Sequence, residues 1–254
     1  MEKYVNWNQL DKSSKMVIYA FDHAAIFGNI PGLENPGALY ERLIPYTDAM
    51  LTSFTSYKKW AKTINQTAGV LRCDGGWSPL QNSSYNNFNL YLDCSDARKL
   101  GAKGVICMAI FGDKESEKTL ANVAKLARSA KEEGIFVIGE VLFNRPVTLE
   151  ERCAAVRITS EWGVDVIKTE YPGNVEDFKV LLNSTHLPVV VLGGQRKNDP
   201  REILEMIAEV MKAGGNGVAI GRNVFQQPNP EPLARAIYAV VHENASVEDA
   251  LAAK

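Results

Sequence analysis

Short apolar runs alternate with longer segments of helical period along the whole chain. Runs such as "MVIYAF" and "GVICMAIF" are continuously apolar, which is typical of strands that are covered on both faces. Segments such as "EKTLANVAKLARSAKEEG" and "PREILEMIAEVMKAGG" carry apolar residues at i, i+3 and i+4 and end at glycine, as amphipathic helices do. The pattern predicts strands at residues 16–21, 48–54, 69–74, 104–111, 135–143, 164–170, 187–194 and 217–221.

Helices between consecutive strands favour parallel pairing, because each helix carries the chain back to the end of the sheet at which the preceding strand began. Eight such units in 254 residues predict an α/β protein with a (β/α)8 TIM barrel. A doubly wound open sheet is the alternative, but it usually has fewer strands, and no G-x-G-x-x-G follows a strand here. No linker divides the chain, so we expect one barrel domain over residues 1–254, with residues 1–15 as a short N-terminal segment.

Composition narrows the class of partner. The chain is 46% apolar and 23% charged, so it can bury a full core. Its 28 basic and 30 acidic residues are spread evenly, and we therefore expect a small-molecule partner and neither nucleic acid nor a membrane. The polar N-terminus and the lack of a run near the ~20 apolar residues of a membrane span predict a cytoplasmic protein. The four cysteines form no C-x-x-C pair and are predicted to be buried, reduced thiols.

Polar residues stand where several strands end, which is the end of a TIM barrel that holds active sites. The first strand runs into Asp22 and His23, and the fifth carries Glu140 among apolar neighbours. The sixth carries Lys168, with Glu170 two residues later on the same side of the strand. These residues are the candidates for chemistry.

A long segment, residues 73–93, follows the third strand and is rich in asparagine and aromatic residues. Its composition suits neither a helix nor a strand. Loops of this length in compact barrels are often lids or binding loops, although an ordered surface loop is an equal alternative.

Lys168 has a structural and a functional interpretation. In the first, its ammonium pairs with Glu170 or Asp165. In the second, an apolar setting favours the neutral amine, which attacks a ketone to form a Schiff base. The Schiff base accepts the electrons released when an adjacent carbon–carbon bond breaks. Glu140 and Asp22 are the candidates for proton transfer, and the alternative for Glu140 is a satisfied ion pair with Lys168.

The ends of the seventh and eighth strands predict a phosphate site. Barrels often bind phosphate there, because glycines expose backbone N–H groups. Gly193, Gly194, Gly221 and Arg222 fit that role; alternatively, the glycines only form tight turns and Arg222 pairs with a surface acid. His23 either orients the ligand or is a structural histidine bonded within its own loop.

Four segments together resemble one enzyme family. "FDHAAIFGNIPGLENP", "GVDVIKTEYPGN", "PVVVLGGQR" and "AGGNGVAIGRNVFQ" are similar, in order and spacing, to the class I aldolases that include archaeal-type fructose-bisphosphate aldolase, tagatose-bisphosphate aldolase and the autoinducer-2 thiolase. The resemblance spans nearly the whole chain. It implies a (β/α)8 barrel, a Schiff-base lysine at Lys168, an acid at Asp22, phosphate binding at the glycines and Arg222 named above, no metal or other cofactor, and a homo-oligomer.

Two departures from the family bear on the substrate. Archaeal-type fructose-bisphosphate aldolases place a tyrosine proton donor on strand five, where this chain has Leu142 and the acid Glu140 stands instead. A strand-five glutamate resembles the tagatose-bisphosphate branch, but that branch has a strand-four lysine for a phosphate, and "GVICMAIFGD" supplies none. The chain matches neither branch fully, so fructose 1,6-bisphosphate is not assumed.

The sequence therefore predicts an aldolase that acts on a phosphorylated ketose or keto sugar through a Schiff base on Lys168. One alternative is a coenzyme A-dependent, thiolase-like acyl transferase, and another is a non-catalytic barrel that binds a sugar phosphate. A metal-dependent aldolase is disfavoured, because His186 and His242 are expected in a loop and an outer helix, away from His23.

Overall fold

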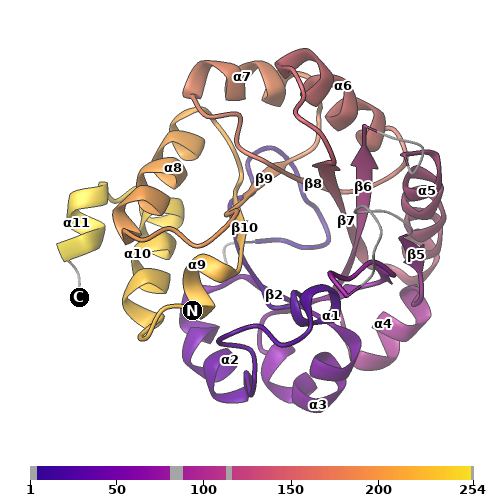
Figure 1. Cartoon of the computed structure of the whole chain (residues 1–254), viewed down its shortest axis with the longest axis horizontal. Coiled ribbons are helices and arrows are strands. Elements are labelled where there is room, and N and C mark those ends of the chain that lie inside the picture. The colour runs from indigo at the N-terminus through magenta and orange to yellow at the C-terminus, as the bar shows by residue number, and fades with distance from the viewer. Residues whose placement is uncertain (1–4, 81–87, 113–115, 253–254) are drawn as a thin grey trace.

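The predicted TIM barrel is confirmed. A computed structural model of the protein describes residues 5–80, 88–112 and 116–252. In this part of the chain eight parallel strands close into a barrel with the order β1-β10-β9-β8-β7-β6-β3-β2, and helices surround it (Figure 1). The barrel strands are β1 (Met16–Ala20), β2 (Ala49–Thr52), β3 (Ala68–Arg72), β6 (Gly104–Phe111), β7 (Phe136–Phe143), β8 (Val166–Thr169), β9 (Val189–Leu192) and β10 (Gly217–Ile220).

Every predicted strand range overlaps one of these strands, and the two helices quoted above correspond to α5 and α8.

Helix starts carry local signals: Thr148 and Glu151 form a capping box at α6, and Asp199 caps α8 ahead of Pro200. The helices are α1 (Ala24–Phe27), α2 (Gly37–Leu43), α3 (Phe54–Ile64), α4 (Cys94–Leu100), α5 (Ser116–Glu133), α6 (Leu149–Ser160), α7 (Val175–Asn183), α8 (Pro200–Lys212), α9 (Arg222–Phe225), α10 (Glu231–His242) and α11 (Val247–Ala252), with a 3-10 helix η1 (Ile44–Tyr46) before β2.

The strands are apolar on both faces because they separate two cores. One core fills the barrel and includes Ile106, Ile138, Val166 and Val190. The other lies between the strands and the surrounding helices. Alternate residues of a strand point to opposite faces, so a polar residue in phase with the inner set points into the barrel. This rule places Glu140 and Lys168 inside it.

Polar side chains tie the strands together at the N-terminal end of the barrel. Asp48, which precedes β2, accepts a hydrogen bond from Val17 N (2.7 Å) in β1. Asp165, which precedes β8, accepts one from Val137 N (2.7 Å) in β7. Each side chain thus satisfies a buried backbone donor of the preceding strand, as Asn216 does for β9.

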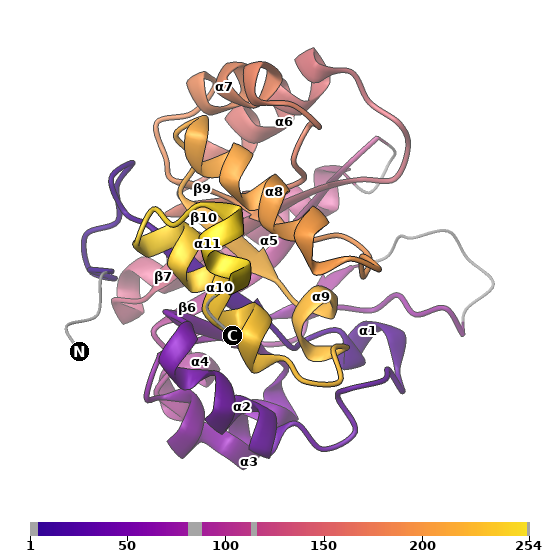
Figure 2. The same ribbon diagram turned by 90° about the vertical axis from the view of Figure 1, so that its left-hand side faces the viewer.

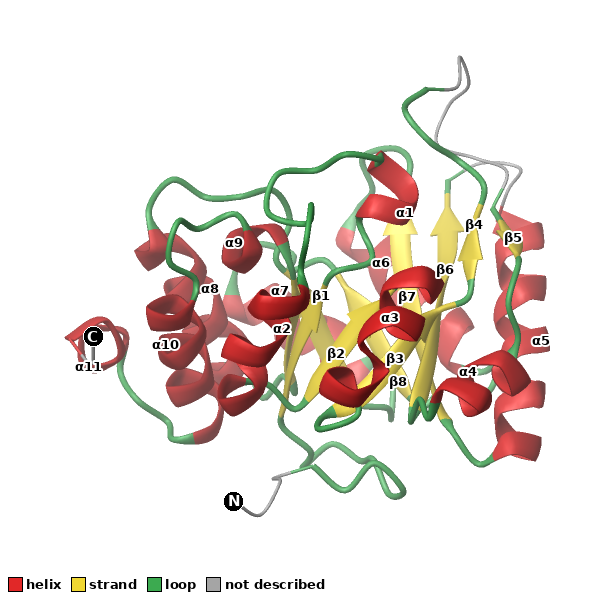
Figure 3. Cartoon of the chain, turned by 90° about the horizontal axis from the view of Figure 1, so that it is seen from below, coloured by secondary structure: helices red, strands yellow, loops and turns green. Residues whose placement is uncertain are grey.

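The N-terminal segment covers this end of the barrel. Trp7 stacks on Phe136 with ring centroids 4.6 Å apart, and Val5 and Leu10 pack against the inner core. Figure 2 shows the described part of this segment, which begins at Val5, at the end opposite α1 and α9, and Figure 3 shows the strands running away from that end. The opposite end is left open for a site.

The segment after β3 differs in part from the prediction. The sequence predicts one strand that ends at residue 74 and then a loop, but β3 ends at Arg72, and β4 (Asp74–Gly75) and β5 (Asn89–Leu90) form a separate short antiparallel pair. The backbone approaches itself across the loop, and this non-local pairing leaves no local sequence pattern. Residues 81–87 of the predicted loop lie outside the described part.

All four cysteines are free thiols. Cys73, Cys94 and Cys107 are buried as predicted, whereas Cys153, on the outer helix α6, is only partly buried. No helix in the described ranges is long and apolar enough to cross a membrane.

Substitution of Asn216 tests the side-chain hydrogen bonds at the N-terminal end of the barrel. Its Oδ1 accepts from Val189 N (2.9 Å), and its Nδ2 donates to Lys12 O (3.0 Å) and Ser14 O (2.7 Å). Asn216→Ala leaves these groups unpaired, so we expect it to lower the free energy of unfolding by about 2–4 kcal/mol in urea denaturation. Asn229→Ala removes an exposed bond from Arg42 and serves as the control, with an expected change within about 0.5 kcal/mol. Equal losses in the two variants would contradict this interpretation.

Candidate active site

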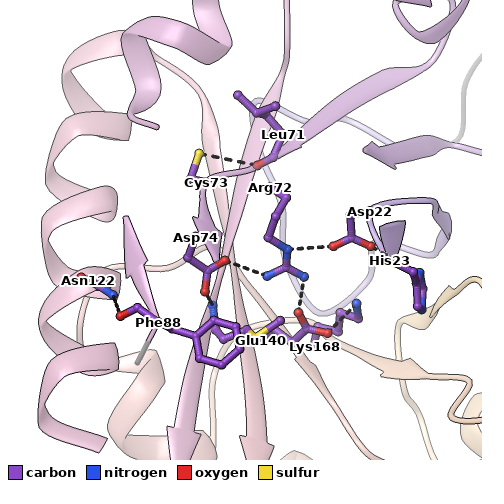
Figure 4. A network of polar contacts seen from close by, with 11 residues as sticks. Asp22, His23, Leu71, Arg72, Cys73, Asp74, Phe88, Asn122, Glu140 and Lys168 are labelled. Atoms are coloured by element: carbon purple, nitrogen blue, oxygen red, sulfur yellow. Dashed lines mark hydrogen bonds and ion pairs between the residues drawn. The ribbon is translucent and has the colours of Figure 1, made fainter. Parts of the chain in front are cut away.

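A buried arginine lies at the centre of the candidate site. Arg72, the last residue of β3, is 4% exposed and binds three carboxylates (Figure 4). Its Nε donates to Asp22 Oδ2 (2.7 Å), its Nη1 to Asp74 Oδ1 (3.0 Å) and its Nη2 to Glu140 Oε2. Asp74 also accepts from Met108 N (2.8 Å), which connects the arginine to the backbone of β6.

Lys168 joins this cluster through Glu140. Its Nζ lies 2.6 Å from Glu140 Oε1, and the two residues face each other in the register of β7 and β8. The ion pair proposed as the alternative for Glu140 is therefore present. Lys168 has a different partner from the two considered for it, because Glu170 pairs with Arg152 (2.8 Å) and Asp165 binds Val137 N.

The charges in this cluster determine the protonation of its carboxyls. Burial by itself raises the pKa of Glu140, but attraction to Lys168 and Arg72 outweighs it and lowers the pKa to about 2. Burial likewise raises the pKa of Asp22, but the combined attraction of Arg72, His23 and Lys168 outweighs it, so that this pKa lies below its ordinary value. Burial prevails at Asp74, whose pKa is raised. Glu140 and Asp22 are thus ionised at neutral pH.

Asp22 and His23 follow β1 at the opening of the barrel. His23 Nδ1 lies 3.6 Å from Asp22 Oδ1, which is longer than a hydrogen bond. Burial lowers the pKa of His23, with opposing effects from Asp22 on one side and from Lys168 and Arg222 on the other. The ring packs edge-on against Phe225 of α9 at 5.4 Å, so His23 connects the β1 loop to the loop after β10.

The glycines after β9 and β10 pack closely. A Cβ on Gly221 would lie 2.4 Å from Ala20 O, and one on Gly193 would lie 2.8 Å from Ile220 Cγ2. Gly194 instead adopts a left-handed φ of +65° with open space around it. Close packing and turn formation therefore account for these glycines, and that packing also brings their backbone to the cavity described next.

Asn223 holds the two loops in place, and its contribution was not predicted. It is 1% exposed; its Nδ2 donates to Gly193 O (2.8 Å) and Gln195 O (3.2 Å), and its Oδ1 accepts from Lys197 N (2.8 Å). The loop after β9 is thereby bonded to α9.

The predicted residues meet around one cavity of about 310 Å3. It opens at the C-terminal ends of the strands, where active sites of TIM barrels lie. All eight predicted site residues line it: Asp22, His23, Glu140, Lys168, Gly193, Gly194, Gly221 and Arg222. Their roles stay predictions, and their convergence from β1, β7, β8, β9 and β10 is an observation.

Arg72 and Asp74 were missed by the sequence analysis. A signal was present: Ala68 and Val70 belong to the inner core, so Arg72, two residues further along the strand, is in phase with the barrel interior. A charged residue at an inward position of an otherwise apolar strand is a candidate for a site.

The DeoC/LacD family aldolase model matches residues 16–227 of the sequence. The chain belongs to this family. An uncharacterized aldolase of Saccharolobus solfataricus is 30% identical, and the alignment covers 95% of this chain and 94% of that protein. A 3-hydroxy-5-phosphonooxypentane-2,4-dione thiolase of Shigella flexneri is 28% identical, with 98% and 96% covered. The family resemblance noted from the motifs is thus confirmed.

Solved structures of similar fold include an archaeal fructose-1,6-bisphosphate aldolase whose catalytic lysine is covalently bound to the carbinolamine intermediate of its substrate. It has a TM-score of 0.81 and 24% identity, with 91% of this chain and 96% of that chain covered. At 24% identity this similarity shows that the two proteins share a fold.

Acid titration tests the electrostatics of the cluster. The pKa of Glu140 is about 2 in the folded protein against an ordinary 4.5, so its ion pairs stabilise the fold above about pH 4.5 and lose this effect as the pH falls toward 2. The shift corresponds to on the order of 3 kcal/mol. We expect Glu140→Gln to be less stable than the wild type near pH 6 and to lose less stability on acidification, as measured by urea unfolding at each pH.

Glu151→Gln is the matched control for this titration. Glu151 also has a pKa lowered to about 2, mainly by the hydrogen bond from Arg145, but this pair is exposed. Water and salt screen an exposed pair, so its removal is expected to change acid stability less. If the two substitutions change the stability at acid pH equally, burial does not account for the stabilising effect of the Glu140 ion pairs.

Proposed function

We propose that the protein is an aldolase that joins Lys168 to a small phosphorylated ketone as a Schiff base. It then forms or cleaves the carbon–carbon bond next to the former carbonyl. The observation that carries this proposal is the buried amine of Lys168, which lines the cavity 2.6 Å from the Glu140 carboxylate. Membership of an aldolase family supports it, as does the lysine-bound intermediate in the archaeal aldolase of similar fold.

The Lys168–Glu140 pair can supply the nucleophile. Transfer of a proton from the ammonium to Glu140 leaves a neutral amine, which attacks the carbonyl carbon of the ketone. Protonated Glu140 then donates to the carbinolamine hydroxyl, water leaves, and an iminium remains on Lys168. Arg72 donates a hydrogen bond to the other oxygen of Glu140, and this bond keeps the carboxyl group oriented toward Lys168 during the proton transfer.

The iminium accepts the electron pair of the bond that breaks. A base removes the proton from the hydroxyl group next to that bond, the aldehyde departs, and the electrons of the bond form an enamine with the iminium carbon. Protonation of the enamine and addition of water release the ketone and restore the amine. Glu140 and Asp22 are the carboxylates that we assign to these proton transfers, since both are ionised and both line the cavity.

The phosphate of the ketone is assigned to the loops after β9 and β10. Gly193, Gly194 and Gly221 bring backbone to the cavity wall, and Arg222 supplies a positive charge beside them. His23 lies against the same loop, because a Cβ on Gly221 would meet its Cε1 at 2.6 Å. Planar guanidinium groups bind phosphate oxygens strongly.

Borohydride trapping tests the nucleophile. The protein is incubated with dihydroxyacetone phosphate and reduced, and the intact mass and the modified peptide are measured. We expect a stable adduct on Lys168, because reduction converts the iminium to a secondary amine. Lys168→Arg is the control, since it retains a positive charge beside Glu140 but cannot form an imine. Absence of an adduct in the wild type, with the ligand still bound, would leave Lys168 as a structural charge in a non-catalytic barrel.

Arg222 provides a test of the phosphate assignment. Arg222→Ala removes a charged hydrogen-bond donor from the cavity, so we expect the concentration of dihydroxyacetone phosphate for half-maximal trapping to rise about 10- to 100-fold. Lys197→Ala is the control: Lys197 lies in the same loop after β9, but its side chain pairs with Glu202 (3.5 Å). Similar shifts in both variants would indicate a diffuse electrostatic effect in place of a phosphate site.

A thiolase-like reaction is the second candidate, favoured by the full-length similarity to a thiolase of a phosphorylated dione. Such a reaction would use the same cavity and move an acyl group to a thiol acceptor. Product analysis with and without coenzyme A distinguishes the two: the aldolase needs no thiol, and the acyl transferase gives product only when the thiol is present.

A further inference from the structure

The cavity has two chemically different sides. On the side of β9 and β10 its lining is glycine backbone together with Arg222. On the side of β6, β7 and α1 its lining is formed by Ile26, Phe27, Met108 and Leu142, which we call the apolar wall. Trp77 and Phe88 belong to the same hydrophobic cluster as Ile26, Met108 and Leu142. Phe27 meets Trp77 edge-on, with ring centroids 6.3 Å apart.

The strand order sets these two sides opposite each other. From β10 the ring passes through β9, β8 and β7 to β6, so β6 lies four steps from β10 in a barrel of eight strands. Lys168 is on β8, midway between them. A ketone bound to Lys168 with its phosphate at the β9 and β10 loops therefore directs its other carbon toward β7 and β6. The register agrees, because Met108, Glu140 and Lys168 are neighbours in adjacent strands.

Charge on the wall side disfavours an anion. Among the described residues that line the cavity, Arg72 and Lys168 are both engaged by carboxylates, and Arg222 lies on the phosphate side. The carboxylates of Glu140 and Glu170 border the remaining space. A phosphate there would lose its hydration next to hydrocarbon. The carboxylates that border this space, Glu140 and Glu170, are already paired with cations, and they offer the phosphate no hydrogen-bond donor.

The adjoining cavity offers an anion no better place. This second cavity, of about 540 Å3, shares Glu170, Gly193 and Gly194 with the first. Three further glutamates of α8 line it: Glu202, Glu205 and Glu209. Lys197 is the single cation among its described lining residues. Neither direction of extension provides a second phosphate site in the described part of the chain.

We propose that the aldehyde partner in the reaction is uncharged and apolar, such as a short aliphatic aldehyde, and carries no phosphate. This inference rests on the proposed function and specifies its second substrate. Ile26, Met108 and Leu142 recognise that partner by contact with its hydrocarbon chain, because each methylene group moved from water to the wall favours binding. The substrate of the cleavage direction is then a ketose with a single phosphate.

The chemical step in the condensation direction is balanced without a further reagent. The enamine carbon attacks the carbonyl carbon of the aldehyde, and the new carbon–carbon bond uses the enamine electron pair. The carbonyl electron pair moves to its oxygen, which takes a proton from the protonated carboxyl that served as base. Water then hydrolyses the iminium and releases the ketose from Lys168.

Competition between two aldehydes tests the inference. The protein is incubated with dihydroxyacetone phosphate and either butanal or glyceraldehyde 3-phosphate, and the condensation product is quantified by mass spectrometry. We expect kcat/KM for butanal to exceed that for glyceraldehyde 3-phosphate by at least about tenfold, because of the cost of placing a dianion on the apolar wall. Equal use, or preference for the phosphorylated aldehyde, would overturn the inference.

Leu142→Lys provides a second measurement. Leu142 is half-buried at the wall, two residues beyond Glu140 on the same side of β7, so a lysine there brings an ammonium into the cavity. We expect it to lower kcat/KM for butanal and raise that for glyceraldehyde 3-phosphate, which changes their ratio by about tenfold or more. Leu142→Met keeps an apolar side chain of similar size and controls for the change of shape. An unchanged ratio in Leu142→Lys would contradict the role of the wall.

The outcomes separate the inference from the proposed function. An adduct on Lys168 with dihydroxyacetone phosphate, combined with preference for the phosphorylated aldehyde or with no product from either aldehyde, overturns the inference and leaves the Schiff base intact. No adduct on Lys168 overturns the proposed function and the inference together.

Discussion

The site depends on one buried cation, Arg72, which binds three carboxylates. Asp22 follows β1, Asp74 begins β4, and Glu140 lies within β7. Arg72 and Lys168 carry two positive charges against three negative charges on Asp22, Asp74 and Glu140, so the cluster has a formal charge of −1 when all five are ionised. Taking these groups out of water is costly, and at Glu140 the attraction to Lys168 and Arg72 exceeds that cost. Its benefit is orientation: a fork of N–H donors holds two of the carboxylates that line the cavity in fixed directions.

In the mechanism that we propose, this arrangement lets a lysine that is only 4% exposed take part in chemistry. The amine of Lys168 needs a partner that accepts its proton and returns it, and Glu140 lies within 2.6 Å. Because Arg72 holds the other oxygen of Glu140, the carboxylate can gain a proton without turning away from the lysine. The ion pair and the catalytic pair considered for Glu140 are therefore compatible: the same contact stabilises the resting protein and supplies the proton transfer that we propose.

Much of the fold was predictable because it depends on local pattern. The continuous apolar runs identified all eight barrel strands, and the glycines and acids at their ends led to residues that line one cavity. The sequence left the partner of Lys168 open among Glu140, Glu170 and Asp165, and the register of β7 with β8 selects Glu140. Arg72 lies inside the predicted strand range 69–74, and its role follows from its inward phase, two residues after Val70 in β3.

Other features depend on contacts between distant segments and left no local signal. The pair β4–β5 forms across a loop, and Asn223 receives its role only when the loops after β9 and β10 come together. The same holds for the apolar wall, whose members come from three elements and meet only in the folded barrel. Sequence patterns identify elements, and the chemistry of a cavity wall is a property of their assembly.

The two ends of the barrel are held by separate sets of side chains. Asp48, Asp165 and Asn216 bind backbone at one end, while Arg72 and its carboxylates act at the other, with layers of apolar side chains between them. Substitutions far apart and without shared partners tend to act independently on stability. The rim to which we assign the ligand can therefore change by substitution while the opposite end preserves the strand register, so a different ligand does not require a different architecture.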